Sequence, residues 1–404
     1  MGYAPAMRGV ALRRLAGRSL AFVAAVSAAV AAAPIARADA PCATPPADDD
    51  WAVATPEAAG FDGRALCAVL EGVAAGTANV HAVLVERHGR LVAELYRTGR
   101  DHPIDERYGI GFGANVAFDA NALHDVRSIS KSVVGLLVGI AVRDGKIQSL
   151  SAPALDAFPE LADLRTNGRE AITIEHLLTM SSGLDWNEWD ASVLASDETR
   201  LFWKADPVRF AFDRPLAHPP GTVFNYDGGL TTTLAALLAR ATGRSIDDLA
   251  REQIFEPLGI ERWVWVRDLH DRPLAFAGLR LRPRDMAKLG RLLLQGGRFG
   301  DREVVPAAWI AASLRPHIGT GDAFGPDPPP FAPRGYGYQW WTGRIAWHGR
   351  ELDWNAGLGN GGQRVFVVPA LDVTLVTTAG DYGSIAIGRA VGRIFADVVA
   401  AVAE

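Results

Sequence analysis

Residues 128–142 are the segment that most constrains the fold of this chain. Their sequence, Ser-Ile-Ser-Lys-Ser-Val-Val-Gly-Leu-Leu-Val-Gly-Ile-Ala-Val, places apolar side chains on every side of a helix. A helix at the surface keeps a polar face toward water, so a helix that is apolar nearly all round is buried. We therefore predict a helix that packs between layers of structure and ends at Gly145.

A serine and a lysine stand three residues apart at the start of this helix. Side chains at that spacing lie on one face, so we expect Ser128 and Lys131 to be in contact. Burial disfavours the charged form of a lysine, so we expect a lowered pKa that lets Lys131 accept the serine proton. The helix N-terminus favours negative charge that develops near Ser128. The pair predicts a nucleophile beside its base.

Strands are predicted near both ends of the chain, around a helical middle. The spacing of apolar residues predicts a helix over residues 62–73, followed by a hairpin of residues 81–87 and 91–96 around a turn at residues 88–90. The other predicted helices are residues 174–180, 231–241, 246–254, 285–294 and 384–402, and the other predicted strands are residues 336–341, 364–368 and 373–378.

This order of elements predicts the domain organisation. Residues 41–149 and 334–404 would form one α/β domain with an antiparallel sheet, and residues 150–333 a mostly helical insertion. Residues 1–40 are set apart as a signal peptide. The remaining chain is long enough for a sizeable core.

The signal peptide is predicted from three features in order. Basic residues precede an apolar run over residues 20–33, and Ala38-Asp39-Ala40 matches the small residues at which a signal peptidase cuts. The apolar run is shorter than the ~20 residues that a membrane-spanning helix needs, although an uncleaved anchor is the alternative. We expect an exported protein, periplasmic or secreted, without stable membrane insertion after cleavage.

Charge and cysteine content limit the partners and the compartment. Five basic residues and one acidic residue fall in residues 1–40, so the mature chain carries a net charge of −9. This charge argues against nucleic acid or an anionic membrane as partner. Cys42 and Cys67 would meet an oxidising compartment and could form a disulfide, but their spacing does not fix their separation, so two unpaired thiols are the alternative.

Residues 124–132, His-Asp-Val-Arg-Ser-Ile-Ser-Lys-Ser, resemble the first motif of the serine β-lactamase-related hydrolases, which include class C β-lactamases and penicillin-binding proteins. Segments that resemble later landmarks of the family follow in the family's order, at residues 174–183, 220–226, 257–260 and 281–290. The resemblance implies a β-lactamase/transpeptidase-like fold, in which an antiparallel sheet is flanked by helices and carries a mostly helical insertion.

The second motif of this family is Tyr-x-Asn or Tyr-x-Ser, and the chain has Tyr226-Asp227-Gly228. The resemblance implies that Tyr226 helps to relay the proton of Ser128. Whether Lys131 or Tyr226 accepts this proton first stays open. The amide of the motif is missing, and Gly228 is expected at the substrate site in its place.

The third motif, Lys-Thr-Gly or His-Thr-Gly in β-lactamases, has no literal copy. Residues 357–359, Gly-Leu-Gly, occupy its place, and such a sequence before a strand lets the backbone approach a substrate closely. The resemblance implies an oxyanion hole formed by the backbone N–H groups of Ser128 and Asn360, with Gly359 at the substrate site. A plain glycine turn is the alternative.

The missing groups are those with which β-lactamases bind a lactam and its carboxylate. The motifs look most similar to the 6-aminohexanoate-dimer hydrolase branch, whose members cleave small linear amides and carboxylic esters. We therefore expect a serine hydrolase that forms an acyl-enzyme on Ser128, acts on a small amide or ester, and needs no cofactor. The alternatives are β-lactamase, D-aminopeptidase or carboxypeptidase activity, or a catalytically silent relative that binds peptidoglycan. The oligomeric state stays open.

Several other polar and aromatic residues are candidates for the site, but each also has a simpler structural interpretation. His124-Asp125 suggests a Ser-His-Asp triad, but the Gly-x-Ser-x-Gly turn of such enzymes is absent from the sequence. His348 is expected at a strand turn on the surface. The remaining candidates are Trp186 and Trp189, as a wall of the acyl pocket or ordinary core, and Asp185, Glu188 and Asp190, as a solvated acidic face without a metal.

Overall fold

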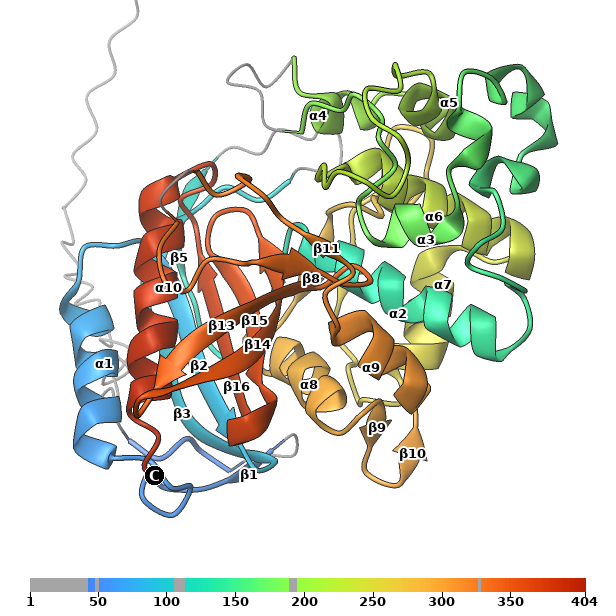
Figure 1. Cartoon of the computed structure of the whole chain (residues 1–404). Coiled ribbons are helices and arrows are strands. Elements are labelled where there is room, and N and C mark those ends of the chain that lie inside the picture. The colour runs from blue at the N-terminus through green and yellow to red at the C-terminus, as the bar shows by residue number, and fades with distance from the viewer. Residues whose placement is uncertain (1–42, 48–50, 105–112, 189–194, 326–327) are drawn as a thin grey trace, which may run out of the picture. The chain divides into compact units, whose positions relative to one another are not determined.

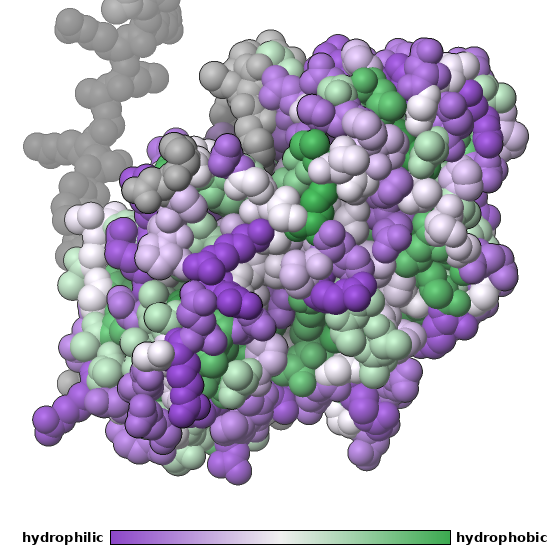
Figure 2. Space-filling model, in the orientation of Figure 1, coloured by the Kyte–Doolittle hydropathy of each residue, from purple (hydrophilic) through white to green (hydrophobic). Residues whose placement is uncertain are grey.

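The computed structural model describes residues 43–404 except 48–50, 105–112, 189–194 and 326–327. The predicted signal peptide and Cys42 lie outside the described residues, so export stays a prediction and only Cys67 of the predicted disulfide can be described. No helix in the described part of the chain is long and apolar enough to cross a membrane. Figure 2 shows hydrophilic residues over much of the visible face, with hydrophobic residues between them.

The central feature is a sheet with the strand order β1-β3-β2-β16-β15-β14-β13-β12-β11 (Figure 1). Neighbouring strands are antiparallel except for β1 and β3, which are parallel. In chain order the strands are β1 Ala52–Val53, β2 Val80–Arg87, β3 Arg90–Tyr96, β11 Ile318–Gly319, β12 Gly335–Tyr336, β13 Trp341–Trp347, β14 Arg350–Gly359, β15 Gln363–Val368 and β16 Val373–Ala379.

The predicted hairpin is confirmed and forms one end of this sheet. β2 and β3 pair around His88 and Gly89, whose φ angles are 54° and 73°. Two successive residues with positive φ are typical of the two-residue turns that match the twist of paired strands. Strand β16, from the far end of the chain, pairs with the other side of β2 and thereby joins both chain ends in one sheet.

Helices cover both faces of the sheet. Figure 1 shows α1 (Gly63–Ala75) and α10 (Ile385–Ala400) on one face, and α2 (Ile129–Arg143) with α8 (Pro283–Leu294) on the other. The predicted helices over residues 62–73 and 384–402 are α1 and α10. Three short pairings lie apart from the main sheet: β4 Thr98–Asp101 with β5 Ala114–Ala117, β8 Leu279–Leu281 with β6 His124–Asp125 and β7 Val264–Trp265, and β9 Arg298–Phe299 with β10 Arg302–Glu303.

The prediction of a buried first-motif helix is confirmed. Every residue of α2 from Ile129 to Ala141 is buried, because α2 packs against the sheet on one side and against helices on the other. Gly145 follows the helix with a φ of 66°. Gly139 leaves room for the ring of Trp309 on α9, since a Cβ at Gly139 would lie 2.3 Å from that ring.

The helical part of the chain lies on the outer side of α2 (Figure 1). Its helices are α3 Ile174–Leu178, α4 Asp197–Leu201, α5 Pro207–Phe212, α6 Gly228–Thr242, α7 Ile246–Ala250 and α9 Ala307–Leu314. Strand β11 belongs to the predicted insertion by residue number but pairs with the edge of the sheet. The division at residues 149 and 333 stays a prediction.

Some predicted boundaries are wrong. The predicted strand over residues 336–341 is two strands, β12 and β13, because Gln339 has a φ of 63° and turns the chain between them. The predicted helix over residues 174–180 ends at Leu178, before Met180 takes a φ of 55°. The segment predicted as one helix over residues 246–254 is α7 followed by a π-helical turn, Arg251–Phe255.

A buried ion pair links α8 to the sheet. Arg284 donates from Nε and Nη2 to the two carboxylate oxygens of Glu94 on β3, at 2.9 and 2.6 Å. The side chains are only 2% and 8% exposed, so removing one partner would leave the other charge buried.

We expect Arg284→Met to lower the free energy of unfolding by about 3–5 kcal/mol, because Glu94 would stay buried without its cation. The matched control is Arg344→Met, which removes an exposed pair with Asp353 at 3.2 Å and should cost at most about 1 kcal/mol. Urea denaturation of both variants measures the difference. Equal losses of stability would contradict this role of the Arg284–Glu94 pair.

Candidate active site

Ser128 lies at the N-cap position of α2, directly after a residue in a strained conformation. Arg127 has a φ of 51°, which is uncommon outside glycine and persists only where the surroundings hold it. Its Nε lies 3.2 Å from Asp125 Oδ2, and its guanidinium lies 4.0 Å from the ring centroid of Tyr382. These contacts fix the turn that presents Ser128.

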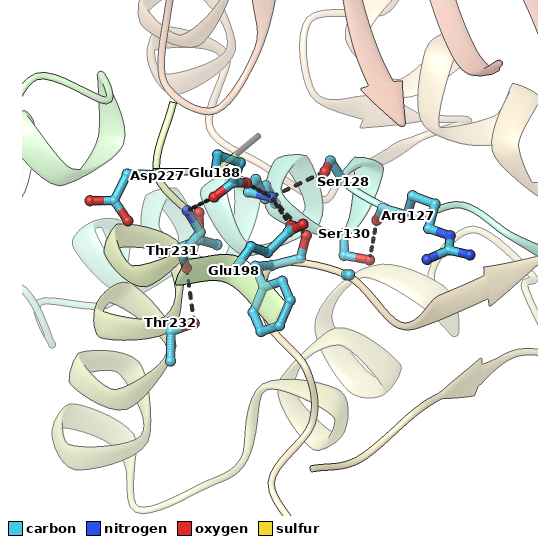
Figure 3. Close-up of polar contacts among 12 residues, drawn as sticks. Arg127, Ser128, Ser130, Glu188, Glu198, Asp227, Thr231 and Thr232 are labelled. Atoms are coloured by element: carbon cyan, nitrogen blue, oxygen red, sulfur yellow. Dashed lines mark hydrogen bonds and ion pairs between the residues drawn. The ribbon is translucent and has the colours of Figure 1, made fainter. Parts of the chain in front are cut away.

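The structure brings Ser128 and Lys131 together, as the i and i+3 spacing predicts. Lys131 Nζ donates to Ser128 Oγ at 3.1 Å and to the backbone oxygen of Phe276 at 3.0 Å. It also lies 3.3 Å from one carboxylate oxygen each of Glu188 and Glu198 (Figure 3). The lysine amine is therefore surrounded by acceptors.

The expected lowering of the Lys131 pKa is wrong. Burial does favour the neutral amine, but the interactions with Tyr226, Glu188 and Glu198 favour the ammonium by more, so the pKa of Lys131 is raised above its ordinary value. Burial of Lys131 follows from the sequence, whereas the charges around its amine depend on the tertiary structure. Lys131 is accordingly charged at neutral pH in this structure.

Glu188 is not part of a solvated acidic face, and this expectation is wrong. Its side chain is 1% exposed. Oε1 faces Lys131, and Oε2 accepts hydrogen bonds from Trp186 Nε1 at 2.6 Å and from the backbone N of Gly228 at 2.9 Å. Asp185 is exposed, as expected, and Asp190 lies outside the described residues.

Gly228 makes room for this carboxylate. A Cβ at Gly228 would lie 3.3 Å from Glu188 Oε2 and 3.3 Å from the Cβ of Phe276. Gly228 stands where the second motif of the family has an amide side chain. The carboxylate of Glu188 lies beside this position and faces Lys131. Gly228 and Trp186, both expected at the substrate site, do not line the cavity at Ser128. They instead hold the carboxylate of Glu188 through hydrogen bonds.

Glu198 is a site residue that the sequence analysis missed. It lies on α4, and its carboxyl group interacts with both Glu188 and Lys131. Removal from water and the neighbouring charge of Glu188 raise the pKa of Glu198 to about 8, although Lys131 acts in the opposite direction. Glu198 is 67 residues from Lys131 in a segment without a motif, so the sequence carries no signal for it.

Tyr226 lies close to both Ser128 and Lys131. Its hydroxyl group shares a hydrogen bond with Ser128, and its ring lies 4.8 Å from Lys131 Nζ and stacks on Trp341. Burial raises the pKa of Tyr226, even though Lys131 acts to lower it, so the phenol is neutral at neutral pH. The next residue, Asp227, caps α6 by accepting from the backbone N of Gly229 at 2.7 Å.

The third motif lies in a strand. Residues 357–359 are the last residues of β14 and pair with β15. The sequence predicted instead a glycine-rich segment that precedes a strand. A Cβ at Gly359 would lie 2.3 Å from the backbone oxygen of Val126, so glycine is needed for this strand to lie against the nucleophile turn. Asn360 follows, and its side chain accepts a hydrogen bond from the backbone N of Gly383.

A cavity of about 1040 Å³ opens at Ser128. Tyr226 and Asn360 line it together with the nucleophile, and so does Gly359. The oxyanion hole of Ser128 and Asn360 stays a prediction, but both residues face the same space. Aromatic side chains form much of the wall: Phe224, Phe324, Phe331, Trp341, Trp354 and Phe366.

Comparison with known proteins identifies the family. A family model for beta-lactamases matches residues 67–389. The chain belongs to the beta-lactamase family. This family comprises serine hydrolases, including esterases and amidases, which agrees with the resemblance in the sequence and with the predicted fold class.

Individual relatives of this beta-lactamase family protein are distant. It is 26% identical over 307 residues to the 6-aminohexanoate-dimer hydrolase of Paenarthrobacter ureafaciens, covering 73% of this chain and 71% of the relative. A penicillin-binding protein homologue from Caulobacter crescentus superposes with a TM-score of 0.62 at 19% identity, covering 83% and 96% of the two chains. A family VIII carboxylesterase superposes with a TM-score of 0.59 at 15% identity, covering 82% and 95%. The structural likenesses support the fold.

The histidine candidates are not part of this site. His124 is buried, stacks on Phe118, and has its pKa lowered by burial to about 3. Asp125 accepts hydrogen bonds from the backbone N of Ile104 and Arg127, so it orients the turn and does not form a triad. His348 bonds to the backbone of the C-terminal segment at the β13–β14 turn, as expected.

Within the described residues, no group of three or more potential ligands is placed to hold a metal ion. Cys67 on α1 is disulfide-bonded, while Cys42 lies outside the described residues. Trp189 also lies outside them.

We expect Gly359→Ala to lower the free energy of unfolding by about 1–3 kcal/mol, because the added methyl group would overlap the backbone oxygen of Val126 and force β14 away from the turn before α2. Gly72→Ala on α1 is the control, since its methyl group would meet no atom within 4 Å and alanine favours a helix. Urea denaturation compares the two. A Gly359→Ala protein as stable as the parent would contradict the close approach.

Proposed function

We propose that the protein cleaves small amides or carboxylic esters through an acyl-enzyme on Ser128. The observation that carries this proposal is the contact of Ser128 Oγ with both Lys131 Nζ and the Tyr226 hydroxyl at the edge of a cavity. The names of two relatives, an amide hydrolase and a carboxylesterase, support these bond types. The missing amide at Gly228 and the missing lysine or histidine at residue 357 argue against lactams.

The proposed reaction has two balanced steps. Ser128 Oγ bonds to the carbonyl carbon while its proton passes to the Lys131–Tyr226 pair, and the pair returns the proton to the leaving nitrogen or oxygen as its bond to carbon breaks. Water then attacks the acyl carbon and gives a proton to the same pair, and the pair returns this proton to Ser128 Oγ as the bond between Oγ and the acyl carbon breaks and the acid leaves. We treat Lys131 and Tyr226 as one coupled acceptor.

The protonation state of this pair sets the pH dependence. Lys131 is charged and Tyr226 is neutral near pH 7, because both pKa values are raised. The pair can accept the serine proton only after it has lost one proton. We therefore propose that activity rises with pH above neutrality.

The first test of the hydrolase is Ser128→Ala. We expect this variant to lose ester hydrolysis by at least about 10³-fold and to take no label from a fluorophosphonate probe. Ser130→Ala is the control within the same motif, because its hydroxyl group donates to the backbone oxygen of Arg127. It should still be labelled.

Full activity of Ser128→Ala would overturn the proposal. Absence of labelling in the parent protein would favour the silent, peptidoglycan-binding alternative. A panel of p-nitrophenyl esters, 6-aminohexanoate dimer, a D-aminoacyl peptide and nitrocefin separates the remaining alternatives.

A second test concerns the carboxylates. Removing the negative charge of Glu188 lowers the Lys131 pKa, so in Glu188→Gln the alkaline rise of kcat/KM should move to lower pH by about 1–3 units. Glu198 has a pKa of about 8 and is mostly neutral below that pH, so Glu198→Gln should change the profile mainly above pH 8.

The control for both variants is Asp185→Asn, an exposed carboxylate in the same segment as Glu188, which should leave the profile in place. The pH dependence of p-nitrophenyl ester hydrolysis measures all three. A profile that moves to higher pH in Glu188→Gln would contradict the role of Glu188.

A further inference from the structure

Tyr382 lies just behind the wall of the cavity at Ser128. It belongs to the short loop between β16, which ends at Ala379, and α10, which begins at Ile385. Gly361 and Gly383 line the cavity, whereas Tyr382 is not among its lining residues. Tyr382 therefore acts on the cavity through the residues that it contacts.

The first contact of Tyr382 is with the turn that precedes Ser128. The guanidinium of Arg127 lies 4.0 Å from the centroid of the Tyr382 ring, a distance at which a cation is attracted to the face of an aromatic ring. The Arg127 side chain points away from Ser128 (Figure 3), and its φ of 51° persists only with support from its surroundings. The ring of Tyr382 thus helps to hold the backbone N–H of Ser128 in place.

The second contact of Tyr382 is with the turn that contains Asn360. Gly361 follows Asn360 between β14 and β15, and a Cβ at Gly361 would lie 2.4 Å from Cδ1 of Tyr382. The ring packs against this turn because the turn has a glycine there. The next residue in the loop, Gly383, donates its backbone N–H to Asn360 Oδ1 at 2.7 Å. The loop therefore contacts the Asn360 turn both through the ring and through the backbone.

The ring is anchored on the side away from these two turns. The Tyr382 hydroxyl group donates to Asp101 Oδ1 at 2.7 Å, at the end of β4, and Asp101 is buried. The preceding residue, Asp381, accepts from Asn79 Nδ2 at 3.1 Å. These hydrogen bonds tie the loop to a part of the chain that is not in the site, so the ring has a fixed place between the two turns.

We propose that Tyr382 is a positioning residue that holds the turn before Ser128 and the turn at Asn360 at the separation that an oxyanion requires. The inference rests on the proposed function for the reaction and on the predicted oxyanion hole for its two N–H groups. Each donor must lie about 2.7–3.1 Å from the same oxygen, so a small change in the spacing of the two turns weakens the hole.

A weakened oxyanion hole has a distinct kinetic signature. The oxyanion develops in the transition state and is absent from the bound substrate, so its loss lowers kcat and kcat/KM by the same factor and leaves substrate binding unchanged. A residue that shaped the substrate pocket would instead change KM.

The first experiment measures hydrolysis of p-nitrophenyl butanoate by two variants of Tyr382. Tyr382→Leu removes the ring, and we expect a loss of roughly 10- to 100-fold in both kcat and kcat/KM, less than the loss when an oxyanion donor is removed outright. Tyr382→Phe keeps the ring and loses the hydrogen bond to Asp101, and we expect a loss of about two- to fivefold. The control is Tyr96→Leu, because Tyr96 also donates to a buried carboxylate, Glu94 at 2.9 Å, but does not line the cavity. It should leave both constants unchanged.

The second experiment measures the inhibition constant of 1,1,1-trifluoro-2-hexanone. Ser128 Oγ adds to its carbonyl carbon, the serine proton passes to the Lys131–Tyr226 pair, and the ketone oxygen becomes an oxyanion without loss of a leaving group. We expect the affinity to fall in Tyr382→Leu by the same factor as kcat/KM. The matched alcohol, 1,1,1-trifluoro-2-hexanol, cannot form the oxyanion, and its affinity should stay the same.

Three results would overturn the positioning role: full kcat in Tyr382→Leu, a loss of kcat/KM without a loss of affinity for the ketone, or an equal loss of affinity for the alcohol. Thermal unfolding shows whether each variant is folded. If Tyr382→Leu is not folded, Tyr382→Phe decides in the same way, since it must lose kcat and affinity for the ketone together.

Hydrogen–deuterium exchange separates this inference from the proposed function. Backbone amides in residues 124–132 and 357–364 should exchange faster in Tyr382→Leu than in the parent protein, and in Tyr96→Leu they should not. If the parent cleaves no ester and reacts with no probe, the proposed function fails, and the exchange rates still show whether Tyr382 holds the two turns. Unchanged exchange in Tyr382→Leu would count against the inference even in an active enzyme.

Discussion

The ammonium group of Lys131 is the constraint on which the site depends. It is fully buried on α2, beside Ser128, and a buried charge is tolerated only with partners around it. Those partners come from separate parts of the chain: Glu188 after α3, Glu198 on α4 and the backbone oxygen of Phe276 before β8. The charge of Lys131 thus links the helical region to α2. It also affects the protonation of the ionisable groups beside Ser128.

The glycine in the second motif and the carboxylate of Glu188 depend on each other. Gly228 provides the space and a backbone N–H, and Glu188 occupies that space and faces Lys131. A neutral amide of the family motif is thereby exchanged for a negative charge. That charge stabilises the ammonium, and in the proposed reaction the pair of Lys131 and Tyr226 therefore needs a higher pH to act as a base.

The predicted elements agree with the structure where local sequence decides them. The hairpin at His88 and Gly89 and the buried helix from Ile129 follow from turn residues and from apolar periodicity, which act over a few positions. The prediction failed at residues 336–341, where Gln339 takes a positive φ without being a glycine. It failed again at Glu188, whose neighbours Asp185 and Asp190 made the segment look like a solvated face.

The sequence by itself identified Ser128, Lys131 and Tyr226 as the candidate site residues, because each belongs to a motif whose spacing is set within a short stretch of chain. Only the tertiary structure decided which charges surround Lys131 and that Gly359 contacts the turn before Ser128. The physical reason is that pKa values and ligand contacts depend on distances between residues far apart in the sequence, and only packing of the chain sets those distances.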